Sequence, residues 1–204
     1  MARILFFTDL HNSSEAIKSI KKKISKFHPN LLVCAGDLAT FGMNLNETLE
    51  KMNFGIPMLI IPGNHETPLQ IEKAGKKFRF LRNIHEKSFI FENFKFLGFG
   101  GSNQTPFNTP YEMHESEIRK KLLGLGRIID GKKIILVTHV PPYGTKLDRI
   151  DSSHVGSREL RKFIEKYQPF MNVCGHIHEN ETLSASIKKT RIINPGPEGK
   201  IMDL

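Results

Sequence analysis

The sequence predicts an α/β domain in which strands alternate with helices and build a mixed sheet or two stacked sheets. Short runs of apolar and β-branched residues that end abruptly in polar residues indicate buried strands. The segments between several of these runs carry apolar residues at helical spacing, which indicates amphipathic helices. Two further pairs of apolar runs, each separated by a short turn, indicate antiparallel hairpins.

Five apolar runs are predicted to be buried strands. They are residues 4–7, 31–34, 58–61, 134–137 and 170–174. A polar residue, often preceded by glycine or proline, follows each run, as is typical where a buried strand ends. One hairpin is predicted over residues 88–98 around the turn at Glu92 and Asn93, and a second over residues 183–193.

The predicted helices lie between the runs. Residues 17–27 carry isoleucines and a phenylalanine at helical spacing, with lysines on the opposite face. Asn12, with Glu15 three residues later, is typical of a capping box that begins this helix. The same apolar stripe recurs over residues 157–167. Three more helices are expected near residues 46–52, 69–81 and 112–123.

Length and composition predict one globular domain over residues 1–204, since 39% of the residues are hydrophobic and can bury a core. No apolar run approaches the roughly 20 residues needed to cross a bilayer. The apolar start is too short for a secretory signal because Asp9 interrupts it. Cys34 and Cys174 cannot build a disulfide framework and are expected to be small buried residues. We therefore expect a cytoplasmic protein without membrane contact.

The chain is basic, with 30 lysines and arginines against 21 acidic residues and a formal net charge of +9. A positive surface attracts anionic partners, and nucleic acid is one candidate. The lysines, however, fall in scattered pairs and triplets, which favours solvated helix faces over a nucleic-acid footprint. Nucleic acid therefore stays an alternative partner.

Polar side chains with oxygen or imidazole donors follow all five predicted strands. They are Asp9, His11, Asp37, Asn64, His65, His139, His176 and His178. Any one of them could be an ordinary cap or turn residue. Their recurrence at the same end of each strand, where α/β sheets bind ligands, predicts a shared site. We expect an extended backbone to direct Asp9 and His11 to one side, and His176 and His178 likewise.

The order Asp-x-His, Gly-Asp, Gly-Asn-His-Glu, His and Gly-His-x-His resembles the calcineurin-like metallophosphoesterase superfamily. The match runs from Asp9 to His178. It is most similar to small phosphodiesterase-type members from archaea and bacteria. The resemblance implies a calcineurin-like αββα sandwich, in which two stacked mixed sheets are flanked by helices.

The resemblance also implies a dinuclear metal site. One ion would be held by Asp9, His11, Asp37 and His178. The second would be held by Asp37, Asn64, His139 and His176, so that Asp37 bridges the two ions. His65 would not be a ligand; it would stabilise charge on the scissile phosphate or protonate the leaving oxygen. A hydroxide that bridges the ions would attack the phosphate.

The residue types fit that chemistry independently. Two divalent ions can clamp the attacking and leaving oxygens of a phosphoryl transfer and lower the pKa of a bridging water. Because only two ligands are carboxylates, the pocket keeps a net positive charge that suits a phosphate ester. Mixed nitrogen and oxygen donors favour transition metals over Ca²⁺ or Mg²⁺; we expect Mn²⁺, with Fe, Zn²⁺, Co²⁺ or Ni²⁺ as alternatives.

Several other residues are weaker candidates. Asn103 is a candidate contact to phosphate or substrate. His154 is a second candidate, but a surface position is the favoured interpretation for it. Glu66 is expected to support the loop that carries His65 rather than to react. His28, His85 and His114 show no partner pattern and are expected to be surface or capping residues.

We expect a metal-dependent phosphodiesterase that hydrolyses nucleotide-like diesters. The alternatives are a nuclease or a phosphomonoesterase of the same superfamily and, from a different class, a non-catalytic scaffold. Leu38, Ala39 and Thr40 follow Asp37 where the related protein phosphatases carry an arginine, which argues against phosphoprotein substrates. The sequence leaves the natural substrate and the oligomeric state open.

Overall fold

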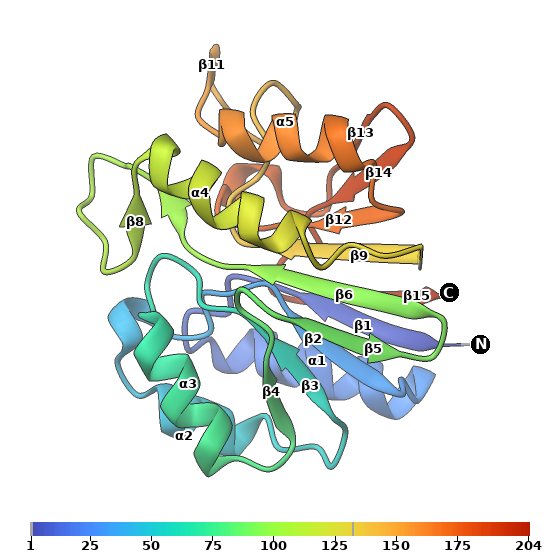
Figure 1. Cartoon of the computed structure of the whole chain (residues 1–204). Helices are drawn as coiled ribbons and strands as arrows, with labels where there is room; N and C mark the ends of the chain where they lie inside the picture. Colours follow the sequence, from blue (N-terminus) through green and yellow to red (C-terminus); the bar gives the residue numbers. More distant parts are fainter. Residues whose placement is uncertain (1, 132) are drawn as a thin grey trace.

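Two sheets stack face to face in a computed structural model that describes residues 2–131 and 133–204 (Figure 1). In the first sheet, four neighbouring strands run parallel and a fifth pairs antiparallel at one edge. Its strands in spatial order are β15 (Lys200–Asp203), β1 (Arg3–Phe7), β2 (Leu31–Cys34), β3 (Met58–Ile60) and β4 (Leu81–Asn83).

The second sheet has six strands. Their spatial order is β13 (Ser184–Ile187), β14 (Thr190–Ile193), β12 (Met171–Val173), β9 (Lys133–Thr138), β6 (Phe94–Phe99) and β5 (Ser88–Phe91). The inner four are parallel, whereas β5 and β13 pair antiparallel with the strands that follow them in the chain. Both predicted hairpins are therefore confirmed.

Helices cover the outer face of each sheet, as Figure 1 shows. The first sheet is covered by α1 (Ser14–Phe27), α2 (Leu45–Lys51) and α3 (Pro68–Lys77), and the second by α4 (Glu115–Gly126) and α5 (Arg158–Tyr167). The shorter elements are η1 (Thr40–Gly42), β7 (Ser102–Asn103), β8 (Glu112–Met113), β10 (Arg149–Ile150), β11 (Ser153–His154) and η2 (His178–Asn180). The expected αββα sandwich is confirmed.

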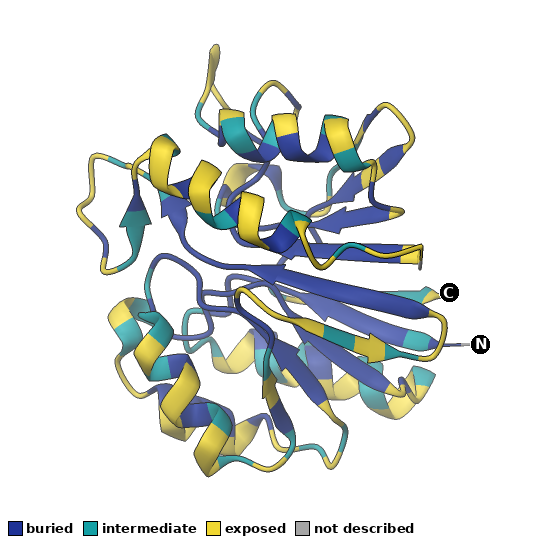
Figure 2. Cartoon of the chain, in the orientation of Figure 1, coloured by how far each residue is buried: buried dark blue, intermediate teal, exposed yellow. Residues whose placement is uncertain are grey.

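The continuous apolar runs arise because each inner strand is covered on both faces. Leu5 and Phe7 of β1 face the helices, while Ile4 and Phe6 face the second sheet. The inner strands are accordingly dark along most of their length in the burial colouring of Figure 2, whereas the outer faces of the helices, the loops and edge strands such as β5 carry exposed residues.

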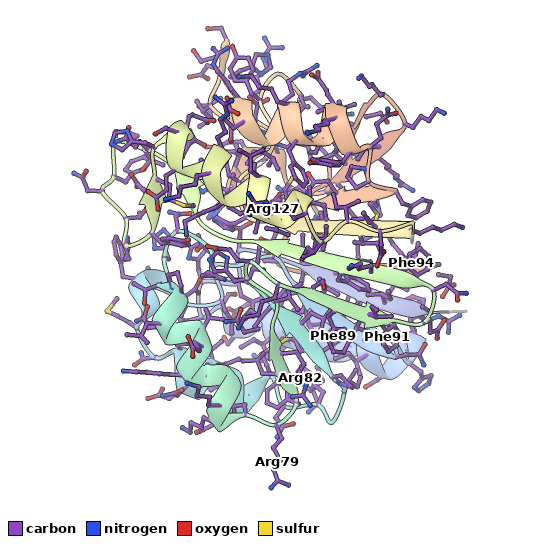
Figure 3. The ribbon with its side chains drawn as sticks, viewed as in Figure 1. Arg79, Arg82, Phe89, Phe91, Phe94 and Arg127 are labelled. Atoms are coloured by element: carbon purple, nitrogen blue, oxygen red, sulfur yellow. The ribbon has the colours of Figure 1, made fainter. Side chains whose placement is uncertain are left out.

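Phenylalanines of the β5–β6 hairpin close one end of the space between the sheets. Figure 3 labels Phe89 and Phe91 on β5 and Phe94 on β6. Phe94 is buried in the inter-sheet cluster, and the other two pack against it. The far end of the sandwich, where the parallel strands finish, is therefore the end left for polar residues.

Several helix boundaries differ from the sequence prediction. The helix expected over residues 69–81 ends at Lys77, because residues 81–83 form β4. Helix α1 begins at Ser14, and its N-cap is Ser13, whose hydroxyl accepts from the amide of Ala16. The prediction of Asn12 as the cap is therefore wrong; this side chain donates instead to the Thr48 hydroxyl at 2.8 Å. Helix α4 begins at Glu115, because residues 112–113 pair as a strand with β7.

The three histidines without an expected site role, His28, His85 and His114, have different surroundings. His28 is the C-cap of α1 and His114 the N-cap of α4, as a capping role predicts. The prediction for His85 is wrong, because its side chain is only 7% exposed and its Nδ1 accepts from the amide of Gly100. Cys34 and Cys174 are buried, as expected. Among the described residues, no helix is long and apolar enough to cross a membrane.

Truncating Phe96 tests the packing between the sheets. Phe96 is fully buried there, so Phe96→Ala should lower the free energy of unfolding by about 3–5 kcal/mol, through lost burial and the cavity left behind. Urea unfolding followed by circular dichroism measures the change. Ile90→Ala, at a side chain of β5 that is 52% exposed, is the control and should cost below about 1 kcal/mol. Equal losses in both variants would contradict this packing.

Candidate metal centre

The carboxyl ends of the parallel strands of both sheets meet at the end of the sandwich opposite the two termini (Figure 1). Asp9 and His11 follow β1, Asp37 follows β2, and Asn64 and His65 follow β3. In the second sheet, the residue after β9 is His139, and His176 and His178 follow β12. The stacking of the sheets thus brings together side chains separated by up to about 170 residues in the chain.

A first group of donors forms around Asp9. The Nε2 atoms of His11 and His178 lie 3.2 Å apart, and His178 Nε2 lies 3.8 Å from Asp9 Oδ1. Asp37 approaches the same group, with Oδ2 3.6 Å from His11 Nε2. Asp9, His11 and His178 offer ligand atoms that all lie within 4.8 Å of one another, close enough to hold one metal ion.

A second group forms on the other side of Asp37. His139 Nε2 lies 3.3 Å from Asp37 Oδ2 and 2.7 Å from Asn64 Oδ1. His176 Nδ1 lies 2.8 Å from the same Asn64 oxygen. Asp37 therefore stands between the two groups. All seven residues expected as ligands are brought together at this end of the sandwich.

Hydrogen bonds fix which atoms of this group face the centre. The backbone carbonyl of Ala35 can only accept, so His139 Nδ1 donates to it at 2.9 Å and the Nε2 lone pair is left for the centre. Asn64 Nδ2 donates to the Thr109 hydroxyl at 2.9 Å, which turns Oδ1 toward the histidines. Two acceptor atoms, His139 Nε2 and Asn64 Oδ1, then face each other at 2.7 Å. Two acceptor atoms this close repel each other unless a cation lies between them, and that cation is either a proton or a metal ion.

The residues that orient Asn64 were missed by the sequence analysis. Thr109 donates to Glu112 Oε1 at 2.6 Å, and Glu112 also accepts from Thr105, so the carboxylate ties the loop after β7. Burial raises the pKa of Glu112, but the hydrogen bonds from Thr105 and Thr109 more than offset this and lower it to about 2. No local motif marks these residues, because their contact with Asn64 spans 45 positions.

A buried carboxylate joins the loops after β2 and β3. Glu66 accepts hydrogen bonds from the amides of Asp37 at 3.1 Å, Ala39 at 2.7 Å and Gly63 at 2.9 Å. Burial raises its pKa to about 8. The expectation that Glu66 supports the loop is confirmed by these contacts.

The backbone at the centre is not extended. Asp9, His11, Asp37 and His176 have φ values of 55°, 47°, 52° and 72°, in the left-handed region. Such conformations cost about 1–3 kcal/mol each for residues other than glycine and concentrate at functional sites. The prediction that extended strands direct each Asp-x-His and His-x-His pair is therefore wrong; tight turns do so. Glycine is required at Gly63, where a Cβ would collide with the Asp37 carboxylate.

Burial sets the charges of the acidic residues. Burial raises the pKa of Asp9 to about 6. It also pushes the pKa of Asp37 upward, but the surrounding imidazoles, His139 first, more than offset this and hold it below its ordinary range. Asp37 is therefore ionised at lower pH than Asp9.

The pKa values of the histidines also shift in opposite directions. Burial lowers the pKa of His139, but the attraction of Asp37 outweighs it and raises the pKa to about 9. Burial lowers the pKa of His11 to about 4 and that of His176 to about 3. These two imidazoles are neutral near pH 7 and have lone pairs to offer a cation.

His65 is held differently from the other histidines. The backbone amide of Phe41 donates to His65 Nδ1 at 3.1 Å, so the proton of the neutral ring lies on Nε2. That Nε2 lies 4.0 Å from Asp37 Oδ2, at the edge of the centre. The tautomer presents an N–H group there rather than a lone pair.

Asn103 and His154 come from two segments that contact each other. Asn103 Nδ2 donates to the backbone carbonyl of Val155 at 3.0 Å, and His154 Nδ1 lies 2.9 Å from Asp148 Oδ1 in the loop before β11. Within the described ranges, neither makes a hydrogen bond or ion pair with the seven grouped residues. The His154 side chain is 36% exposed.

The chain is similar in sequence to an archaeal protein and in fold to a bacterial one. The sequence is 37% identical over 203 residues to the Methanocaldococcus jannaschii protein MJ1162, covering 96% of this chain and 88% of that one. The fold is similar to that of the Thermus thermophilus protein TT1561, with a TM-score of 0.76, 16% identity and coverage of 96% and 89% of the two chains.

Two solved structures with named activities share the fold. A Danio rerio dimetal phosphatase matches with a TM-score of 0.61 and 9% identity, over 94% of this chain and 86% of that one. An archaeal phosphodiesterase matches with a TM-score of 0.53 and 14% identity, over 95% and 83%. Residues 2–180 match the family model for calcineurin-like phosphoesterases. With its clustered aspartates and histidines, the chain belongs to that family of metal-dependent hydrolases of phosphate esters.

Proposed function

We propose that this protein is a phosphodiesterase that hydrolyses nucleotide-like diesters at a centre of two divalent metal ions. The observation that carries the proposal is the pair of facing acceptor atoms beside Asp37: His139 Nε2 and Asn64 Oδ1 lie 2.7 Å apart, while the other polar atom of each side chain is already engaged. The first ion would be held by Asp9, His11, Asp37 and His178, and the second by Asp37, Asn64, His139 and His176.

The donor set fits transition-metal ions. Five of the ligands are neutral imidazole or amide groups and two are carboxylates, so a pair of divalent ions would leave the pocket positive toward a phosphate. Mn²⁺ is the proposed metal, with Fe, Zn²⁺, Co²⁺ or Ni²⁺ as alternatives of similar ligand preference. When bound, the ions would supply a nucleophilic water of lowered pKa and a clamp on the phosphoryl oxygens.

His65 is proposed to stabilise charge on the phosphate. The Phe41 amide donates to Nδ1, so Nδ1 is an acceptor and Nε2 carries the N–H group that faces the centre. A neutral ring with its proton on Nε2 donates a hydrogen bond but is a poor proton donor. Of the two roles considered for His65, the geometry supports charge stabilisation.

The surroundings favour a diester over a monoester. A monoester carries close to two negative charges near pH 7, and a diester carries one. In the part of the chain that the structure describes, no lysine or arginine forms an ion pair with the grouped ligands or with His65. The single charge of a diester needs no side-chain cation at the ligands beyond the metal ions themselves.

Paired chromogenic esters test this function. Metal-stripped protein should hydrolyse bis-p-nitrophenyl phosphate when Mn²⁺ is restored, and should prefer it to p-nitrophenyl phosphate. Asp37→Asn, which removes the shared anion, should abolish turnover and reduce bound metal. A preference for the monoester would favour the phosphomonoesterase instead. Inactivity on both esters by protein that holds metal would contradict catalysis and favour the scaffold.

Replacing His65 separates its proposed role from metal binding. His65→Ala should lower kcat by about a hundredfold, the usual loss when one donor to a developing oxyanion is removed. Metal content, measured by inductively coupled plasma mass spectrometry, should stay at the wild-type value. His65→Gln, which restores an N–H donor, should recover part of the rate. Parallel loss of metal from His65→Ala would show that the residue is a ligand.

Metal affinity should rise with pH. In the metal-free protein the pKa of His139 is about 9, so its proton is present at neutral pH and a metal ion must displace it. Affinity should fall about tenfold per unit from pH 8 to pH 6, and more steeply below about pH 6, where Asp9 binds a second proton. Calorimetry of Mn²⁺ binding in buffers of different ionisation enthalpy should detect about one proton released. Affinity that does not change between pH 6 and pH 8 would refute this coupling.

A further inference from the structure

An exposed phenylalanine stands at the edge of the centre. Phe41 lies in η1, four residues after Asp37, and is 49% exposed. Its φ of 49° places this bulky residue in the left-handed region, which is uncommon outside glycine, asparagine and aspartate. Strained backbone that holds a large apolar side chain at the surface calls for a functional explanation.

Two contacts hold the Phe41 ring in place. Its backbone amide donates to His65 Nδ1 at 3.1 Å. Its ring meets the His65 ring edge to face, with centroids 4.7 Å apart and planes at 73°. One side of the phenyl ring is thus anchored on the residue next to the proposed metal centre, while about half of the side chain stays open to solvent.

A polar groove begins at the residue after Phe41. It lies between α2 and α3 and combines amide side chains with ammonium groups. The groove is lined by Gly42, Asn44, Leu45, Asn46, Glu47, Gln70, Lys73, Ala74 and Lys77. Amides can hydrogen-bond to the edges of bases, and lysines attract phosphate. Phe41 adjoins the groove in the chain, since the next residue, Gly42, lines it. An exposed aromatic ring next to amide and ammonium groups has the chemistry of a nucleotide subsite.

The other exposed phenylalanines do not share this setting. Phe170 is similarly exposed, at 45%. It precedes β12, so it lies at the amino end of that strand, whereas the centre lies beyond the carboxyl end. Its ring packs on Phe94, with centroids 5.8 Å apart. Phe107, at 76% exposed, lies in the loop that reaches Asn64 through Thr109 and makes no ring contact within the described ranges. Among the exposed phenylalanines of the described ranges, only Phe41 contacts a residue of the centre through its ring.

We propose that Phe41 is the platform on which one nucleobase of the substrate stacks while the neighbouring phosphate occupies the metal centre. This inference rests on the proposed phosphodiesterase function and narrows its substrates to nucleotides. Stacking of a base on an aromatic side chain is sequence-tolerant, because every base has a flat face. The enzyme should therefore require a base on one side of the phosphate but accept different bases there.

Dinucleotides that lack one base test the platform directly. Thymidylyl-thymidine is compared with two analogues in which the base on either side is replaced by hydrogen, so that the scissile ester is unchanged. With wild-type protein and Mn²⁺, one of the two deletions should raise KM about tenfold, and the other should have little effect. In Phe41→Ala neither deletion should matter, whereas Phe41→Tyr should restore the dependence. Phe170→Ala, the matched control, should behave as wild type.

Binding without turnover gives a second measurement. Calorimetry compares thymidine monophosphate with deoxyribose phosphate, which lacks the base. The ratio of their Kd values should be about ten in wild-type protein and close to one in Phe41→Ala. Metal content should not change, since the substitution keeps the backbone amide that contacts His65.

The two proposals fail in different ways. If bis-p-nitrophenyl phosphate is hydrolysed but the base dependence is absent, or is the same in wild type and Phe41→Ala, the platform is wrong and the phosphodiesterase stands. Turnover of that ester with no turnover of thymidylyl-thymidine would also overturn the platform. If metal-loaded protein hydrolyses neither, the proposed function itself fails.

Discussion

The carboxylate of Asp37 is the charge around which this end of the molecule is organised. It is 2% exposed, and imidazoles from three other loops approach its Oδ2 within 3.3–4.0 Å. A buried anion is costly unless it is paired and hydrogen-bonded. Here the cost is offset by the pull of His139 and by the His65 amide, which donates to Asp37 Oδ1 at 2.9 Å. A cation at this point would neutralise the buried carboxylate and remove the repulsion between the facing acceptor atoms.

The rest of the sandwich holds that charge in place. Each sheet supplies only part of the donor set, so stacking them is what completes the groups on either side of Asp37. Glu66 ties the loops after β2 and β3 through three amides. Gly63 leaves room for the carboxylate. Buried apolar strands on both faces provide a rigid base for four ligands with left-handed backbone.

The same loops connect the centre to the outer surface. The Phe41 amide sets the tautomer of His65, and the Phe41 ring packs against the same histidine. The next residue, Gly42, lines the groove between α2 and α3. On the other side, the Glu112 carboxylate orders the loop that turns the Asn64 oxygen inward. The tautomer of His65 and the orientation of Asn64 thus each depend on a hydrogen bond to a loop whose own sequence carries no motif.

The buried strands, the hairpins and the residue types of the centre could be predicted from sequence patterns, because buried strands need continuous apolar runs and strand ends collect polar ligands. The stacking of two sheets into a sandwich was implied by the family resemblance. The sequence pattern misplaced the cap of α1, since Asn12 and Ser13 are both good caps and only the contact with Thr48 selects between them. Tertiary structure alone decided the left-handed turns, the tautomers of His65 and His139, and the setting of Phe41. The two tautomers depend on hydrogen bonds between residues 24 and 104 positions apart, which no local pattern encodes.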